Sequence, residues 1–335
     1  MLYRSIVFTN APLLEAFRYK DKFQLVPFLY FKNARFSEYT THFPAFIEYE
    51  AEEIEEINPA FEDYMRAKGL NDGVIKFGRT IPNQTRVRRE LLHVLSALTN
   101  FHFFEYSSPR DCWGIQVPDK TVDKLSEEEI QALDNAEAHW TKAVYTYKEC
   151  GVDLKCNGFT DCSKFILPVS DGRTYFTVNP DIDNNPCVKL PPYLEFCLDR
   201  YYAMDDEMRK RVRHCVGLLY DGIELFDYKR SVSLMAIVSS LEGMAKLDFE
   251  LYRQVASLGP TNRFVRYLKR YVAGLSEDKY RKYYDVRCQI THDGHLFIGD
   301  DDINSDIDEQ NRDWLLRLEI LQVARLAFYN WLRRN

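Results

Sequence analysis

The strongest constraint on the fold is a run of helical patterns that fills the C-terminal part of the chain. Three prolines in "NNPCVKLPPYLEF", residues 184–196, come just before it. Five segments with apolar residues at helical spacing then follow in succession: residues 207–226, 230–247, 261–274, 278–292 and 311–334. Successive amphipathic helices bury their apolar faces against one another, so these segments predict a compact all-α bundle.

The N-terminal part predicts a mixture of strands and helices. "RSIVFTN" and "FQLVPFLYF", beginning at residues 4 and 23, are typical of short strands, and "YEAEEIEEI", residues 49–57, predicts a solvated helix face. Residues 82–99 carry apolar side chains at helical spacing, and "NFHFFEYSS" after them favours another strand.

Two local signals add a helix and a hairpin to this part. Ser126 and Glu129 form a capping box that opens a helix running to about Tyr147. Asp171 and Gly172 are typical of a hairpin turn. We therefore expect an α+β domain of residues 1–190, with a sensor or regulatory role left open, followed by an all-α domain of residues 191–335.

Composition narrows the class of protein. The 335 residues have a net charge of −7, but residues 200–335 carry 22 Lys and Arg against 21 Asp and Glu, so the excess acidity is N-terminal. Since the chain starts without the apolar core of a signal peptide and no run approaches the ~20 apolar residues that span a bilayer, we expect a soluble cytoplasmic protein. Its eight cysteines are then reduced thiols.

Basic side chains concentrate ahead of one short motif. Residues 253–287 hold nine Lys and Arg against three Asp and Glu. Arg263, Arg266 and Arg270 fall on one helical stripe, with apolar residues on the other faces. Such a stripe can follow a phosphate backbone, but it is also what a solvated helix surface looks like.

The motif itself is "KYYDVRCQITHDGHLFIGD", residues 282–300, in which Arg287 and His292 stand five residues apart. On an ideal helix they would point about 140° from each other. If the helix ends near Thr291 and Gly294 adopts a left-handed conformation, His292 lies in a loosened last turn, where the helix dipole favours its protonated form. A histidine, with an unperturbed pKa of ~6.5, can exchange protons near neutral pH.

The order of these segments resembles the HEPN superfamily, and most closely its Apea-like branch. The resemblance covers roughly residues 200–335 and rests on "SLMAIVSSLEGMA" with Glu242, then "RFVRYL", then "YYDVRCQITHDG", then a terminal apolar helix. It implies a metal-independent endoribonuclease of bacterial antiviral defence that works as a homodimer and whose substrate is RNA. The two motif helices of the dimer would form one cleft.

The resemblance also implies residue roles. Arg287 would hold the scissile phosphate and His292 would act as general base or acid while the ribose 2′-OH attacks phosphorus. Glu242 would orient Arg287, and Cys288 stands where relatives carry a polar residue. The remaining side chains expected to bind RNA are Arg263, Arg266, Arg270, Lys282 and His295.

Each of these residues has an ordinary structural alternative. Arg287 can be a surface arginine paired with a carboxylate, and His292 can cap a helix. Glu242 can be a buried acid satisfied inside the bundle, and His295 can be a solvated loop residue. Since Cys288 is only a weak hydrogen-bond partner, a catalytically silent HEPN module that binds RNA or mediates assembly is the main alternative function.

Other patterns favour no cofactor. Cys150, Cys156 and Cys162 are spaced too widely for a usual zinc site, although a metal-responsive or ligand-responsive regulator built on them is a third possibility. "DDDINSDIDEQN", residues 300–311, starts like a calcium loop but has Ser305 where the glycine belongs, which favours an acidic linker. No phosphate-binding glycine loop is present. The identity of the RNA and a phage-derived or other protein trigger are left open.

Overall fold

The computed structural model describes residues 1–28, 43–52, 59–70, 83–105, 152–166, 175–177, 187–252, 258–297 and 307–334, together with Ser126, Glu128 and Asp300. Contacts divide the chain into two units. Unit 1 comprises residues 1–8, 13–91 and 104–165, and unit 2 comprises residues 9–12, 92–103 and 166–335. The predicted boundary after residue 190 falls inside unit 2 and stays a prediction.

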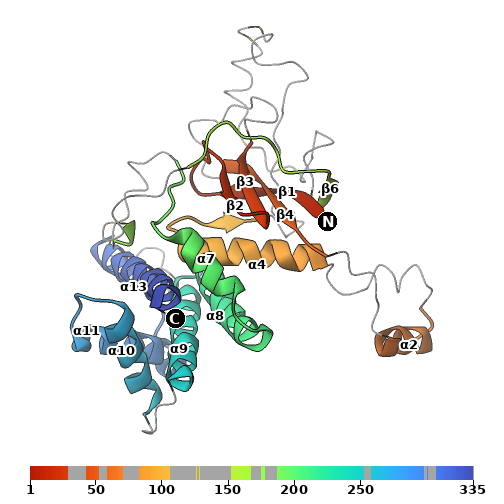
Figure 1. Ribbon diagram of the computed structural model, residues 1–335. Helices are drawn as coiled ribbons and strands as arrows, with labels where there is room; N and C mark the ends of the chain where they lie inside the picture. The colour runs from red at the N-terminus through yellow and green to blue at the C-terminus, as the bar shows by residue number, and fades with distance from the viewer. Residues whose placement is uncertain are drawn as a thin grey trace. The chain divides into compact units, whose positions relative to one another are not determined.

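Unit 1 is built on a sheet. The strands of the sheet are β1 (Leu2–Thr9), β2 (Phe17–Tyr19), β3 (Phe23–Pro27), β4 (Phe43–Glu50), β5 (Phe103–Phe104) and β6 (Leu154–Cys156). The last residue of β1 and the first of β5 are assigned to unit 2. The strand order is β2-β3-β4-β1-β5, with β6 paired to β1 (Figure 1). The pairs β2–β3, β3–β4 and β1–β6 are antiparallel. The strands predicted at residues 4 and 23 are confirmed.

Two helices belong wholly or partly to this unit. They are α2 (Pro59–Ala67) and α4 (Asn83–Leu98), which begins in unit 1 and ends in unit 2. The helix predicted over residues 82–99 and the strand after it are confirmed as α4 and β5. The helix predicted at residue 49 is wrong at its start, because Tyr49 and Glu50 end β4, and residues 53–57 lie outside the described residues. So do the hairpin at Asp171 and Gly172 and, apart from Ser126 and Glu128, the helix expected to run to about Tyr147.

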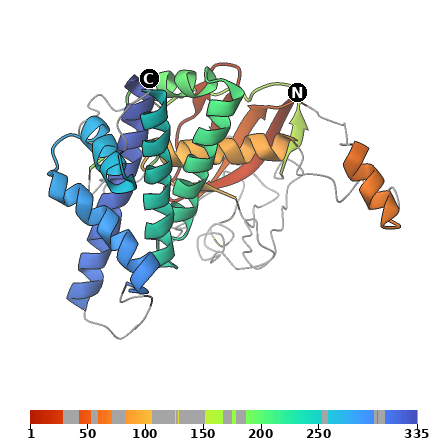
Figure 2. The same ribbon diagram turned by 90° about the horizontal axis from the view of Figure 1, so that it is seen from below.

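The described C-terminal part is mostly helical, which confirms the sequence of five helical segments. The helices are α7 (Leu194–Tyr202), α8 (Asp206–Glu224), α9 (Arg230–Leu251), α10 (Pro260–Tyr271), α11 (Glu277–Cys288) and α13 (Ile307–Arg334), with a π-helical turn η2 (Gln289–Asp293) after α11. Helix α9 packs against α8, α10, α11 and α13, and Figure 2 shows α9 beside α13. Whether this bundle is HEPN-like stays a prediction.

Local sequence explains where several of these helices begin and how closely they pack. Asp205 caps α8 by accepting a hydrogen bond from the Met208 N–H at 2.7 Å, and Ser276 caps α11. Helices α8 and α9 approach closely because Gly222 has no side chain, and a Cβ there would lie 2.5 Å from Ile237 Cγ1. Of the aromatic residues on α13, Trp331 is buried in the core whereas Trp314 is exposed.

Candidate functional site

The motif lies where α11 passes into a π-helical turn. Helix α11 ends at Cys288, and the backbone continues as η2 to Asp293, two residues beyond the expected helix end. Gly294 then adopts the left-handed conformation predicted for it, with φ of 70° and ψ of 15°. A π turn hydrogen-bonds residues five apart, so it reduces the angular separation of about 140° that an α-helix would give Arg287 and His292.

Arg287 is held by a carboxylate from another helix. Its Nη2 lies 3.1 Å from Oε2 of Glu242 on α9, and the two side chains are 21% and 22% exposed. The Arg287 guanidinium carbon also lies 5.9 Å from the centroid of the Tyr284 ring. The guanidinium is therefore fixed in a half-buried position rather than extended into solvent.

Glu242 serves two partners at once. Burial raises the pKa of the Tyr284 hydroxyl, and its hydrogen bond to Glu242 and the nearby negative charge raise that pKa further, against the lowering effect of Arg287. Tyr284 is buried and packs edge-on against Phe264 of α10 at 5.4 Å between ring centroids. The Tyr284 hydroxyl and the Arg287 guanidinium together keep the Glu242 carboxylate in place.

His292 is exposed and sits in the last turn of the helical segment. The Thr291 hydroxyl donates to the Arg287 carbonyl oxygen at 2.8 Å, which occupies one backbone acceptor at this helix end. The negative end of the helix dipole remains close to the imidazole. His292 thus lies where a substrate in solvent can reach it, one turn from the half-buried Arg287.

The loop after the motif is anchored to the start of α9. The Phe297 N–H donates to Ser231 Oγ at 2.9 Å, and the Phe297 ring is buried. The Asp300 carboxylate accepts hydrogen bonds from the backbone N–H groups of Arg230 at 3.1 Å and Ser231 at 2.6 Å. Asp300 therefore caps α9 from about 70 residues away in the chain.

This cap was missed at the sequence level. Asp300 was assigned to an acidic linker, of which residues 301–306 lie outside the described residues. An aspartate directly before α9, at the position of Lys229, would have been a visible capping signal. A cap supplied by a distant loop leaves no pattern in the local sequence.

The residues expected to bind RNA do not all project freely. Arg270 lies 3.6 Å from the buried carboxylate of Asp248 and covers the Tyr252 ring at 3.7 Å, and Arg263 lies 5.9 Å from the Phe249 ring. Arg266, Lys282 and His295 are exposed. Part of the basic stripe on α10 is therefore used to hold α9.

The cysteines that the structure describes show no metal arrangement. In the part of the chain that is described, no group of three or more His, Cys, Asp or Glu side chains could hold a metal ion, and Cys150 lies outside that part. Burial raises the pKa of Cys156, and it raises that of Cys162 to about 11. Cys288, half-buried at the end of α11, stands beside Arg287 in sequence.

Comparison of the chain with protein-family models, with curated proteins and with solved structures finds no match. The HEPN resemblance therefore rests on the motif and its order alone. Within the described residues, no helix has both the length and the apolar character needed to cross a membrane.

Proposed function

We propose that the protein is a metal-independent endoribonuclease of the HEPN type, with Arg287 and His292 as its catalytic residues. The observation that supports this most is the ion pair between Arg287 and Glu242 at 3.1 Å, with the exposed His292 following on a π turn. π turns are rare in proteins and occur frequently at functional sites.

The chemistry requires no group beyond these side chains. The ribose 2′-OH attacks the adjacent phosphorus, the bond from phosphorus to O5′ breaks, and the products are a 2′,3′-cyclic phosphate and a 5′-OH. His292 takes the proton from the 2′-OH or delivers one to O5′. Arg287 stabilises the charge that develops on the non-bridging oxygens.

Glu242 is compatible with this role for Arg287. A guanidinium carries five N–H donors, so one carboxylate does not exhaust it. A fixed guanidinium also loses less side-chain entropy when a phosphate binds. The ion pair with Glu242 thus orients the Arg287 guanidinium and leaves some of its N–H donors available for a phosphate.

The remaining parts of the proposal rest on the family resemblance. The protein forms a homodimer in which the motifs of two copies face one RNA-binding cleft, and its setting is defence against phage in the cytoplasm. The exposed cations Arg266 and Lys282 and the exposed His295 contribute to RNA binding. The N-terminal part acts as a sensor or regulatory module.

The test is RNA cleavage by the purified protein in EDTA, with total tRNA and a generic single-stranded RNA as substrates. We expect products with cyclic-phosphate ends, and a loss of activity of about 10²–10⁴-fold in His292→Ala. Arg287→Ala should lose activity too. The matched control is Lys210→Glu on α8, an exposed cation of the helical unit. Cleavage that survives in both Arg287→Ala and His292→Ala would refute this assignment.

A catalytically silent RNA-binding module is the second candidate. It is favoured by the same ion pair, since a purely structural arginine would also be held by a carboxylate, and by Cys288 beside it. Two results would support this alternative: RNA binding that is the same in Arg287→Ala as in wild type, and no RNA cleavage in cells with or without phage infection.

A further inference from the structure

The described residues form an open hollow on the surface of unit 2, away from the Arg287 and His292 motif. Its volume is about 590 Å³, and it is lined by Tyr252, which follows α9, and by Arg266, Lys269 and Arg270 of α10. Three cations and one aromatic ring are the side chains that nucleic-acid sites for unpaired strands combine.

One part of the hollow is a cation–π pair that a buried carboxylate holds in place. The Arg270 guanidinium lies 3.7 Å from the centroid of the Tyr252 ring and 3.6 Å from the Asp248 carboxylate. Asp248 is 7% exposed and also accepts a hydrogen bond from the Tyr271 hydroxyl at 2.6 Å. Because Asp248 is itself immobilised, the guanidinium and the ring form a cation–π pair of two planar groups that exists before any ligand binds.

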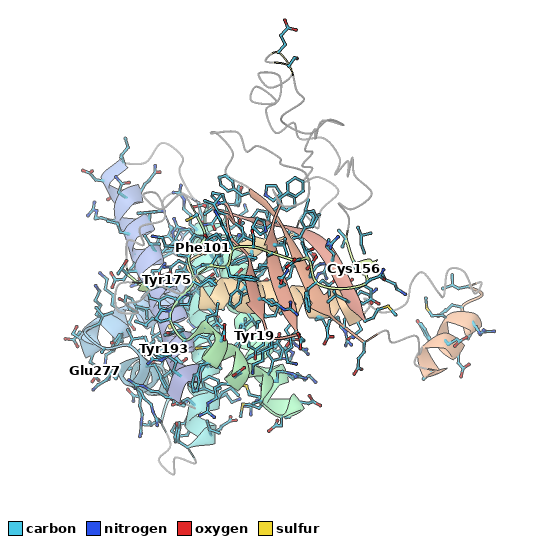
Figure 3. The ribbon with its side chains drawn as sticks, turned by 45° about the horizontal axis from the view of Figure 1, so that its top comes forward. Tyr19, Phe101, Cys156, Tyr175, Tyr193 and Glu277 are labelled. Carbon is cyan, nitrogen blue, oxygen red and sulfur yellow. The ribbon has the colours of Figure 1, made fainter. Side chains whose placement is uncertain are left out.

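The other part is a surplus of positive charge. Arg266 is exposed, and its charge acts on the Asp248 carboxylate, which is in direct ion-pair distance of Arg270. Lys269 pairs at 2.8 Å with Glu277, which Figure 3 shows at the edge of the helical unit, but Glu277 also pairs with Arg281 at 2.8 Å. One carboxylate therefore serves two cations, and the hollow keeps a net positive charge.

We propose that this hollow binds one nucleotide of an unpaired RNA strand, with the phosphate on Arg266 and Lys269 and the base stacked on the cation–π pair of Tyr252 and Arg270. The proposal rests on the proposed ribonuclease function and names the substrate class, single-stranded RNA. Bases inside a duplex are stacked on each other and cannot use such a surface, whereas splayed bases stack on aromatic rings and guanidinium planes.

The position of the hollow determines its role. Glu242, which holds Arg287, and Tyr252 are ten residues apart, with Glu242 within α9 and Tyr252 at its end, which corresponds to roughly 15 Å along the helix. A strand bound at both places must extend over several nucleotides. The hollow thus holds the strand beyond the point of cleavage and selects RNA that is unpaired over that length.

The experiment measures binding separately from cleavage. A fluorescent RNA of about ten nucleotides without self-complementarity is titrated with the His292→Ala protein, and anisotropy gives Kd at several salt concentrations. Adding Tyr252→Ala should raise Kd at least about fivefold, whereas Tyr252→Phe, which keeps the ring, should leave it unchanged. Arg266→Ala should lower the slope of log Kd against log salt by about 0.7.

Matched controls and a second ligand make the outcomes distinct. Lys210→Glu on α8 changes an exposed cation elsewhere in the unit, and it should raise Kd less than Arg266→Glu does. With an abasic oligonucleotide of the same length, Tyr252→Ala should have no effect. Two results would overturn the proposal. If Tyr252→Ala weakens binding of abasic RNA as much as that of normal RNA, the site is a general anion surface. If polyglutamate binding depends on Arg266 and Tyr252 as strongly as RNA binding does, the site is an acidic-peptide surface.

The two proposals also fail separately. RNA bound through Tyr252 and Arg266 but never cleaved would retain the nucleotide subsite and reject the ribonuclease. If Tyr252→Ala changes neither the rate of RNA cleavage nor the Kd for RNA, the ribonuclease proposal stands and the nucleotide subsite is rejected. A thermal melt of Tyr252→Ala and Arg266→Glu, with both expected to match the parent, checks that these exposed positions leave the fold intact.

Discussion

Asp300 is expected to hold the motif loop to the rest of the bundle, and Asp300→Ala tests this. The carboxylate accepts two backbone hydrogen bonds from the first turn of α9, at 3.1 and 2.6 Å. Replacing an N-terminal cap by alanine costs about 0.5–2 kcal/mol, and a hydrogen bond to a charged group contributes about 1.5–3 kcal/mol. Since solvent can replace part of this, we expect a loss of about 2 kcal/mol in the free energy of unfolding.

The pH dependence of this contribution has a definite sign. Burial alone would raise the pKa of the Asp300 carboxyl, but hydrogen bonds from Ser231 and Arg230 and the charge of Arg230 bring it below its usual value. A carboxyl with a lowered folded pKa stabilises the protein fully above its unfolded pKa of ~3.9 and loses this contribution as the pH falls through the folded value. The difference between wild type and Asp300→Ala should therefore be full at pH 7 and shrink below about pH 4.

The assay combines urea unfolding, followed by far-ultraviolet circular dichroism, with hydrogen exchange at the Ser231 and Phe297 amides. Asp300→Asn keeps one of the two acceptor oxygens and places an amide NH2 opposite the other backbone N–H, so it should lose about 1 kcal/mol, less than Asp300→Ala. Asp205→Ala removes the cap of α8 and is the matched control, because it should destabilise the protein by about 1 kcal/mol without speeding exchange at Phe297. Wild-type stability and unchanged exchange in Asp300→Ala would refute the role assigned to this carboxylate.

Two further predictions concern packing and a buried charge. A Cβ at Gly222 would lie 2.5 Å from Ile237 Cγ1, so Gly222→Ala should lower stability by about 1–3 kcal/mol in urea unfolding, whereas Gly259→Ala, with open space around it, should change it by less than about 0.5 kcal/mol. Equal effects would contradict the close approach of α8 and α9. Buried Arg88 pairs with the largely buried carboxylates of Asp153 and Glu105, so Arg88→Ala should cost about 3–5 kcal/mol by leaving both without this partner. A melting temperature within a few degrees of wild type would show that water replaces the pairs.

The sequence predicted those elements whose signal is local. Helices α4, α8 and α13 have long apolar periodicities, so the backbone conformation follows from neighbouring residues alone. The left-handed Gly294 was predictable for the same reason, since only glycine enters that region at little cost. Tyr49 and Glu50 were misassigned because acidic residues favoured a helix, whereas pairing with β3 places them in a strand.

Features that depend on distant residues were not predictable. Arg317 and Arg325 lie on α13 among apolar residues and are almost fully buried, although their sequence gives no sign of it. Arg325 donates hydrogen bonds at 3.2 Å to the carbonyl oxygens of Ser96 and Asn100, at the end of α4, and burial lowers its pKa to about 10. A cation at a helix C-terminus is stabilised by the helix dipole, but only the tertiary fold brings the two together.

The positions of Arg287 and His292 in space depend on two such distant contacts, both to α9. π turns are rare and occur mostly as single turns within α-helices, so contacts on both sides of this one are expected to help hold it. Glu242 fixes Arg287 before the turn, and the first residues of α9 fix the loop after it through Phe297 and Asp300. These anchor points lie about twelve residues, or roughly 18 Å, apart on a single helix. Helix α9 therefore holds both Arg287 and the loop that follows the turn containing His292. If either contact is broken, we expect the turn to relax towards an α-helical form, which would increase the angular separation of His292 and Arg287.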